Sequence, residues 1–280
     1  MLLAYIDTNV FLDFYQSSTD RLAVFEDILG RAGNVLLTQQ TVEEFRRNRV
    51  ARLTQLSDAV RKGPHGQIHT TAVVQALPGF QDWVKARDAT KAAALEIAKE
   101  LTSWVHNEQS DPVLVAFEKL VAGSQNIITT PDLVAKARTR KLLGSPPTSP
   151  DKHTIGDELN WECLLTWTGS DVVIVTRDKT YLDNQAILKR EFGAATGRQL
   201  AMVTDSLSLG LEKIGLASEK IKEAEKKLPA KIDEDAFPTD GVCPSCNCAL
   251  EEEGYEGSDG DSAWWLYCAK CRKTFFPPRR

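Results

Sequence analysis

Apolar residues gather in four short runs that predict the strands of a buried parallel sheet. The runs cover residues 2–6, 34–38, 171–176 and 199–204. Strands covered on both faces show such nearly continuous apolar stretches, because neither face meets water. Helical patterns separate the runs, so we expect an α/β domain in which right-handed crossovers join parallel strands.

The helical pattern is longest between the second and third runs. A basic helix is predicted from Thr41 to Arg61, and it ends before a Gly-Pro pair. An all-helical stretch follows over about residues 78–141, which is longer than a crossover needs, so we expect a helical insert over about 64–143 that forms a lid or an arm. A proline-rich loop over 144–151 then leads into a helix from Ile155 to Trp167.

The composition of the chain changes after about residue 212. Residues 213–240 begin as a Lys/Glu/Ala-rich helix that ends at Pro229 and continue as an acidic, turn-rich segment. Residues 241–280 hold a separate group of cysteines. We therefore expect three parts: a domain over 1–212, a charged helical spacer and linker over 213–240, and a small module over 241–280.

Charge and hydropathy exclude several classes of protein. The formal net charge of −5 and the pI of about 5.5 argue against a protein that coats nucleic acid by bulk charge. No apolar run approaches the ~20 residues of a membrane-spanning helix. The first residues lack the basic start of a signal peptide, so we expect a cytoplasmic protein with reduced cysteines and no membrane partner.

Four acidic residues are placed where a parallel sheet would bring them together. Asp7 and Asp178 follow predicted strands, Glu44 begins the helix after the second strand, and Asp157 opens the helix before the third. Ligands of open parallel sheets bind outside the carboxyl ends of the strands. Each acid also has a simpler interpretation as a cap or turn residue, and Glu43 competes with Glu44, but convergence of all four favours a site.

Carboxylates gathered at one point repel each other unless a cation neutralises them. Mg²⁺ or Mn²⁺ suits such oxygen ligands and can also hold the phosphate oxygens of a substrate. With two ions about 4 Å apart, one activates water and the other stabilises the leaving oxygen. Hydrolysis of phosphodiester bonds is the chemistry that this arrangement favours.

Four segments, in this order, resemble the acidic motifs of PIN domains: YIDTNVFLDF, TVEEFRRNR, PDKHTIGDELNWECLL and VVIVTRDKTY. The resemblance covers about residues 1–212. It implies a PIN-like three-layer fold with a Rossmann-like central sheet, and cleavage of single-stranded RNA with Mg²⁺ or Mn²⁺. The long helical insert departs from compact members of the family.

The resemblance also assigns roles to single residues. Asp7, Glu44, Asp157 and Asp178 match the metal-binding acids of the family, whereas Asn9 and Thr176 match supporting polar positions. We expect an endoribonuclease, with DNA as the alternative substrate. The competing hypotheses are a non-catalytic nucleic-acid-binding scaffold and a haloacid-dehalogenase-like phosphatase, although Asn9 stands where that phosphatase chemistry wants a second Asp.

Basic residues cluster in two of the predicted helices, where they are candidates for a groove that follows a phosphodiester backbone. The alternative is an ordinary solvated helix face. The candidate nucleic-acid-binding residues are Arg46, Arg47, Arg49, Arg138 and Arg140.

Two CxxC pairs near the end of the chain predict a structural zinc ribbon. Their cysteines, Cys243, Cys246, Cys268 and Cys271, have the spacing of a tetrahedral Cys₄ site. Cys248 competes with Cys246, but the two-residue spacing favours Cys246. Zinc would supply much of the folding free energy of so small a module, whose partner we expect to be nucleic acid, another protein or a second copy of the chain.

Overall fold

The computed structural model describes residues 2–15, 21–62, 71–150, 152–216, 221–222, 250–256, 262–267 and 274–275. The chain divides into two compact units, Met1–Lys227 and Leu228–Arg280. No helix in the described ranges is both long and apolar enough to cross a membrane.

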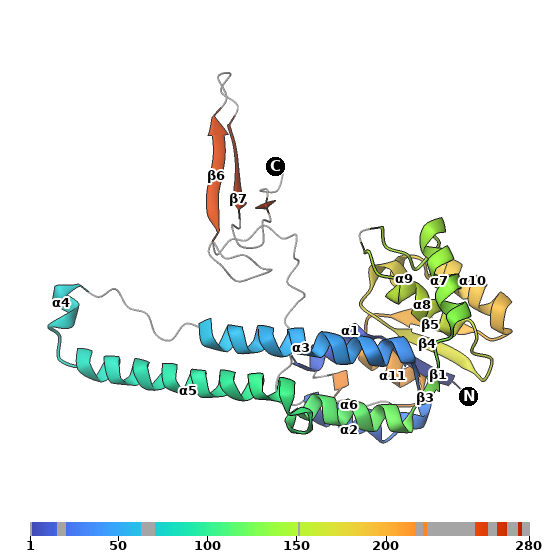
Figure 1. The fold of residues 1–280 in the computed structure, drawn as a ribbon, viewed down its shortest axis with the longest axis horizontal. Helices are drawn as coiled ribbons and strands as arrows, with labels where there is room; N and C mark the ends of the chain where they lie inside the picture. Colours follow the sequence, from blue (N-terminus) through green and yellow to red (C-terminus); the bar gives the residue numbers. More distant parts are fainter. Residues whose placement is uncertain are drawn as a thin grey trace. The chain divides into compact units, whose positions relative to one another are not determined.

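A parallel sheet of five strands forms the centre of the first unit (Figure 1). Its strands lie in the spatial order β3-β2-β1-β4-β5. Their bounds are β1 (Leu2–Ile6), β2 (Val35–Thr38), β3 (Gln125–Ile127), β4 (Asp171–Val175) and β5 (Leu200–Thr204). Four of them match the four apolar runs of the sequence to within a residue, which confirms the α/β class and the parallel sheet.

Strand β3 corrects the expectation that residues 78–141 are all helical. It has three residues, Gln-Asn-Ile, and only Ile127 is buried. It occupies the edge of the sheet beside β2, pairing Leu37 with Asn126. So short and polar a strand has no hydrophobic run to reveal it, and its position depends on the neighbour with which it pairs.

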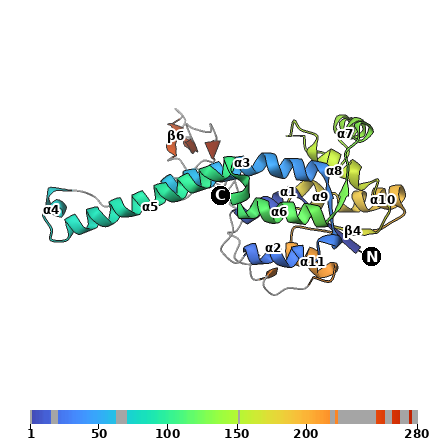
Figure 2. The same ribbon diagram turned by 60° about the horizontal axis from the view of Figure 1, so that its bottom comes forward.

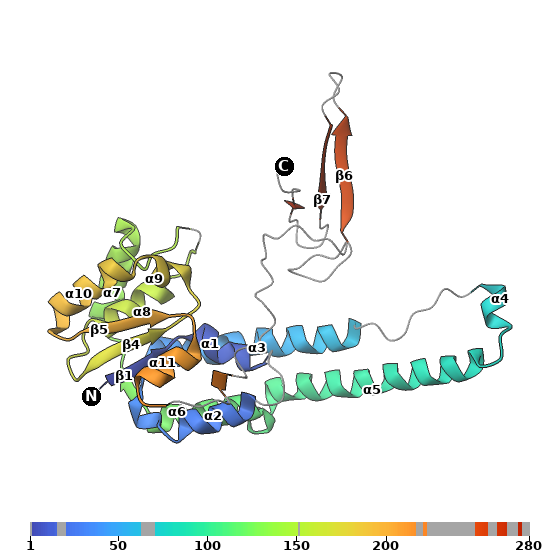
Figure 3. The same cartoon turned by 180° about the vertical axis from the view of Figure 1, so that it is seen from behind.

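Two helical layers cover the sheet because side chains of each strand alternate between its faces. In β1, Ala4 and Ile6 belong to one buried cluster, with helical residues from within 10–53, 113–120 and 207–211. Leu3 and Tyr5 belong to the other cluster, with helical residues from within 133–192. The view from behind shows the sheet between these two groups (Figure 3). This arrangement is the expected three-layer domain.

The helices of the first unit connect these strands in chain order. Their bounds are α1 (Thr8–Leu12), α2 (Arg21–Leu29), α3 (Gln39–Lys62), α4 (Ala72–Gln75), α5 (Phe80–His106), α6 (Pro112–Gly123), α7 (Pro131–Leu143), α8 (Gly156–Leu164), α9 (Lys179–Asp183), α10 (Gln185–Thr196) and α11 (Leu207–Lys213), with short 3₁₀ turns at Asp13–Tyr15, Ala32–Asn34 and Glu108–Ser110.

Helices α3 and α5 form an arm that projects from the three-layer body. They lie side by side in all ribbon views, and α4 lies at the far end of α5 (Figure 2). In α5 only Ala94 and Ala98 are buried, and Ser57 of α3 donates a hydrogen bond to the backbone oxygen of Ala98. The small alanines let the helices approach closely. Within the range expected as an insert, α4 and α5 belong to this arm, whereas α6, β3 and α7 belong to the three-layer body.

The described part of the second unit is an antiparallel sheet in the order β6-β7-β8. The strands are β6 (Glu251–Glu256), β7 (Ser262–Tyr267) and β8 (Thr274–Phe275). Strand β7 ends at Tyr267, directly before the second CxxC pair in the sequence. The four expected zinc ligands and Cys248 lie outside the described residues, as does most of the expected spacer.

Candidate active site

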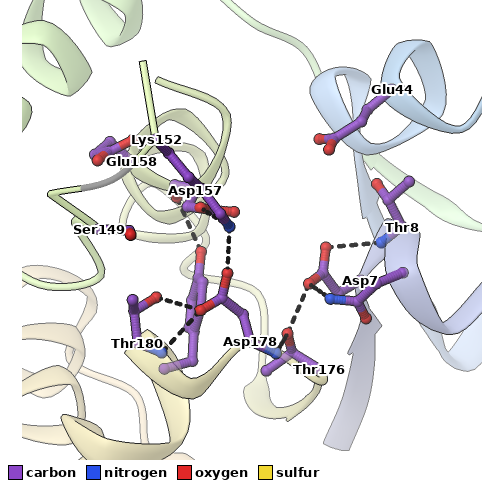
Figure 4. Close-up of polar contacts among 12 residues, drawn as sticks. Asp7, Thr8, Glu44, Ser149, Lys152, Asp157, Glu158, Thr176, Asp178 and Thr180 are labelled. Atoms are coloured by element: carbon purple, nitrogen blue, oxygen red, sulfur yellow. Dashed lines mark hydrogen bonds and ion pairs between the residues drawn. The ribbon is translucent and has the colours of Figure 1, made fainter. Parts of the chain in front are cut away.

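Asp7 lies at the carboxyl end of β1, where three donors hold its carboxylate (Figure 4). The amide of Thr8 donates to Oδ1 at 2.7 Å, while Nδ2 of Asn9 and Oγ1 of Thr176 donate to Oδ2 at 2.8 and 2.6 Å. Asp7 also caps α1, so the capping interpretation and the site interpretation are compatible. The two supporting residues expected from the sequence, Asn9 and Thr176, both contact Asp7.

The strand register explains why residues so distant in sequence meet here. Strands β1 and β4 are parallel neighbours, and Ile6 pairs with Val175. The next residue of each strand is therefore Asp7 in one and Thr176 in the other. The amide of Asp7 donates to the oxygen of Val175, which continues the ladder to the site.

Glu44 projects from the second turn of α3 on the same side of the site as Asp7 (Figure 4). A Cβ atom added to Gly156 would stand only 3.5 Å from Oε2 of Glu44, so the first residue of α8 meets this carboxylate directly. The neighbouring Glu43 is exposed and accepts a hydrogen bond from Gln39. The geometry therefore favours Glu44 over Glu43 as the residue of the site.

Asp157 and Asp178 form the other half of the site, and Lys152 lies between them (Figure 4). The ammonium of Lys152 donates to Oδ2 of Asp157 at 2.7 Å and to Oδ2 of Asp178 at 2.5 Å. Asp178 also caps the short helix α9, accepting hydrogen bonds from the amide and hydroxyl of Thr180. Lys152 therefore neutralises two of the expected metal ligands.

Burial and crowding of negative charge perturb the acids of the site. Burial, with further contributions from the charges of Asp157 and Glu44, raises the pKa of Asp7 to about 7. The pKa of Glu44 is also raised, by burial and by Asp157. The charge of Asp157 thus contributes to both pKa shifts, although Asp157 lies on the other side of the site from Asp7 and Glu44 (Figure 4).

The pKa values of the two carboxylates that contact Lys152 shift in opposite directions. Burial raises the pKa of Asp157, which the hydrogen bond from Lys152 opposes without reversing. For Asp178 burial acts in the same direction, but the hydrogen bonds from Lys152 and Thr180 outweigh it, so its pKa is lowered. Asp178 is therefore the carboxylate that the protein itself neutralises most completely.

A buried polar network lies beneath the site and fixes α8 to the sheet. The hydroxyls of Thr38 and Thr41 donate to Oδ1 of Asn160 at 2.5 and 3.3 Å. Tyr5 shares a hydrogen bond of 3.0 Å with Thr41, and the Tyr181 hydroxyl donates to the backbone oxygen of Asp157. These contacts set the position of α8, and thus of Asp157, relative to the strands.

The chemistry of the donor set fits a hard divalent cation. Carboxylate oxygens are its preferred ligands, and the buried Asp7 has its charge opposed by two other acids. Gly156 also leaves beside Glu44 the space that a Cβ would fill. In the described parts of the chain, however, no three His, Cys, Asp or Glu side chains gather closely enough to hold one ion. The Lys152 ammonium already holds two of the four acids.

The expected basic residues have different environments. Arg49 is 2% exposed and donates to the buried Asp111 at 2.7 Å, and the Arg140 side chain is 9% exposed and bonded to Glu162 and Glu191. Arg46 is exposed and forms a two-pronged pair with Glu118, whereas Arg47 and Arg138 are exposed. The structure thus does not bring the five arginines together on one open face.

Lys152 is the residue of this site that the sequence interpretation missed. It stands in the segment PDKHTIGD, five positions before Asp157, and a lysine in a proline-rich loop resembles any solvated surface residue. The one feature of the sequence that could have pointed to Lys152 is its position inside the third acidic motif. Asn160 and Tyr181 were also missed, because their hydrogen bonds join elements that are distant in sequence.

Comparison with known families agrees with this geometry. A family model described as PIN domain matches residues 5–181, more than half of the 280-residue chain. No curated protein and no solved structure matches the chain. PIN domains are generally nucleases and typically use Mg²⁺ or Mn²⁺. By the extent of the family match and the placement of the acids, the chain belongs to the PIN domain family.

Proposed function

We propose that this protein is an endoribonuclease that uses Mg²⁺ or Mn²⁺ to hydrolyse phosphodiester bonds of single-stranded RNA. The observation that carries the proposal is the placement of Asp7, Glu44 and Asp157, from three different elements, at one end of the parallel sheet, where burial and the charges of the other two acids raise the pKa of Asp7 to about 7. Acids placed at the ends of parallel strands are suited to a divalent ion that offsets their charge.

The residues of the chain have separate roles in this proposal. Asp7, Glu44, Asp157 and Asp178 would hold the ion, which supplies the charge that polarises the phosphodiester and activates water. Thr176 and Asn9 orient the carboxylate of Asp7. Arg46, Arg47 and Arg138 are the exposed candidates for contacting RNA phosphates, while Arg49 and Arg140 stabilise the fold through buried ion pairs.

The test is cleavage of an end-labelled, unstructured RNA by purified full-length protein in Mg²⁺, in Mn²⁺ and with a chelator. We expect cleavage that needs the metal and disappears in Asp7→Asn and in Asp157→Asn. Asp183→Asn is the matched control, because Asp183 is exposed at the far end of α9. Cleavage that survives the chelator, or both site substitutions, would refute the proposal. A DNA strand of the same sequence decides between RNA and DNA.

One observation favours a second candidate, a non-catalytic RNA-binding scaffold. Lys152 neutralises Asp157 and Asp178 within the protein, so these two carboxylates do not require a metal. A scaffold of this kind would bind the same RNA equally with and without Mg²⁺ and would leave it intact. Metal-dependent cleavage excludes it.

We also propose that residues 241–280 form a zinc ribbon with Cys243, Cys246, Cys268 and Cys271 as ligands. The support is the spacing of the two CxxC pairs. The ribbon is then a small, metal-stabilised module suited to a nucleic-acid or protein partner.

A further inference from the structure

The two halves of the acidic site differ in how their charge is balanced. The Asp157–Asp178 pair shares the ammonium of Lys152, whose Nζ lies 2.7 Å from Oδ2 of Asp157 and 2.5 Å from Oδ2 of Asp178. For the Asp7–Glu44 pair, the described residues include no cation within ion-pairing distance, although Arg47 on the same helix and, more weakly, Lys152 attract the charge of Glu44. One half is therefore neutralised by the protein, and the other is not.

The position of Lys152 follows from contacts that anchor the preceding loop. Nζ of Lys141 donates to the backbone oxygen of Ser149 at 2.6 Å, and Nη1 of Arg140 donates to that of Pro146 at 2.7 Å. Both cations belong to α7, which packs against α8. Since α8 carries Asp157, α7 positions both the loop and this acid. The ammonium of Lys152 is thereby held close to its two acceptors.

The contacts of Lys152 limit what else this half of the site can bind. Formal charge does not choose between one ion and two, because with Lys152 and four ionised carboxylates one divalent ion leaves a single negative charge and two leave a single positive charge. The Lys152 ammonium, however, already contacts Oδ2 of both Asp157 and Asp178. A second ion that uses these oxygens has to displace Lys152, so the contacts favour one ion over two.

We propose that Lys152 serves as the cation of the Asp157–Asp178 pair, so that the protein binds one divalent ion tightly at the acidic site and admits a second only when Lys152 is displaced. This inference rests on the proposed metal-dependent function and specifies how many ions the site takes. Lys152 is a competitor for an ion position here, and it holds its two acceptors in place when that ion is missing.

The experiment is a titration of the full-length, zinc-loaded protein with Mn²⁺, in which electron paramagnetic resonance measures the free ion. Wild-type protein is expected to bind one Mn²⁺ tightly. Lys152→Gln removes the charge and keeps an extended side chain. In this variant the second Mn²⁺ should bind about tenfold more tightly, an estimate reduced for a lysine that is 46% exposed.

Two further variants separate the contact of Lys152 from a general change of charge. Lys152→Arg keeps a cation at the position and should retain the wild-type binding of one tight ion. Lys179→Gln removes a charge from the exposed residue next to Asp178, which forms no ion pair with any described residue. It should also leave Mn²⁺ binding as in wild type. A thermal melt of each variant verifies that it is folded.

Equal numbers and affinities of Mn²⁺ sites in wild type and Lys152→Gln would overturn the inference, as would two equally tight ions in wild type. These outcomes are distinct from failure of the nuclease proposal, because Mn²⁺ binding needs no RNA. A protein that binds ions as expected but cleaves nothing refutes the nuclease and leaves the role of Lys152 standing. A metal-dependent nuclease with unchanged binding in Lys152→Gln refutes only the role of Lys152.

Discussion

Thr176 and Asp7 lie 169 positions apart in the chain, and a hydrogen bond of 2.6 Å joins them at the ends of adjacent strands. The hydroxyl of Thr176 also accepts from the amide of Asp178 at 3.0 Å. One side chain therefore connects an acid of each half of the site. It depends on the parallel pairing of β1 with β4.

Replacing Thr176 with Val tests this connection. The variant keeps the shape of the side chain but removes the donor to Asp7 and the acceptor for Asp178. We expect a loss of about 1 kcal/mol in the free energy of unfolding. Mn²⁺ affinity should fall by about tenfold or more, as when other residues that orient metal ligands are changed. Thr139→Val, on the exposed face of α7, is the control for both measurements.

Metal binding should stabilise the wild-type protein and not the Asp7→Asn variant. A ligand that binds only the folded state adds about 2.7 kcal/mol at one hundred times its dissociation constant. We expect Mg²⁺ to raise the melting temperature of wild type in proportion to this gain. Without metal, Asp7→Asn should melt no lower than wild type, because it removes a buried charge repelled by Asp157 and Glu44. Equal Mg²⁺-induced shifts in the two proteins would contradict Asp7 as a ligand.

Arg49 and Arg47, two residues apart on α3, should differ sharply when each is changed to Met. The guanidinium of Arg49 pairs with Asp111, which is fully buried and also accepts from the hydroxyl of Tyr15 at 2.6 Å. Arg49→Met leaves the buried carboxylate of Asp111 without its cation. The free energy of unfolding, measured in urea, should therefore fall by about 3–5 kcal/mol. Arg47→Met should change stability by less than about 0.5 kcal/mol while weakening RNA binding. Equal losses of stability would contradict the structural role of Arg49.

Gly156 should be required for the approach of α8 to Glu44. An alanine there would place Cβ 3.5 Å from Oε2 of Glu44 but only 3.2 Å from Nε2 of Gln40, so the Gln40 amide, which donates to Glu44, must shift. We expect weaker Mn²⁺ binding with little loss of stability. Gly193→Ala in α10, where the nearest neighbour is 3.7 Å away, should leave Mn²⁺ binding unchanged and stabilise its helix by about 0.5–1 kcal/mol. Unchanged Mn²⁺ binding in Gly156→Ala would show that the contact is not needed.

The zinc proposal predicts one equivalent of zinc in protein purified without added metal, measured by elemental analysis. Cys246→Ser should lower the zinc content strongly, because a thiolate ligand is lost. Cys248→Ser is the matched control and should retain full zinc content. The reverse result would exchange the roles of the two cysteines, and absence of zinc from wild type would remove the ribbon.

The sequence predicted the apolar strands of the sheet well and the short polar edge strand poorly. Strands β1, β2 and β4 are buried almost throughout, and such continuous burial requires apolar residues at successive positions. Strand β5, at one edge of the sheet, still buries Leu200, Val203 and Thr204. Strand β3 has a single buried residue, so nothing in its composition distinguishes it from a loop. It is a strand because the edge of β2 provides hydrogen-bond partners.

The same contrast applies to charged residues. Asp7 and Asp178 follow apolar strands, and this local pattern was enough to select them as candidates. No comparable local pattern distinguishes the buried arginines of α3 and α7 from the exposed ones. Arg46 and Arg49 both looked like exposed groove residues, yet only the packing of α6 and its preceding turn decides that Arg49 is enclosed by Asp111.

By itself, the sequence determined the four apolar strands in chain order, the acids near the strand ends and the two CxxC pairs, because hydrophobic period and residue spacing are local properties of a chain. Only the tertiary structure decided which carboxylate carries its own cation. Lys152 meets Asp157 and Asp178 through a loop tied to α7 and a helix tied to the sheet. Electrostatic pairing depends on distance in space, and that distance is set by packing between elements that are far apart in the sequence.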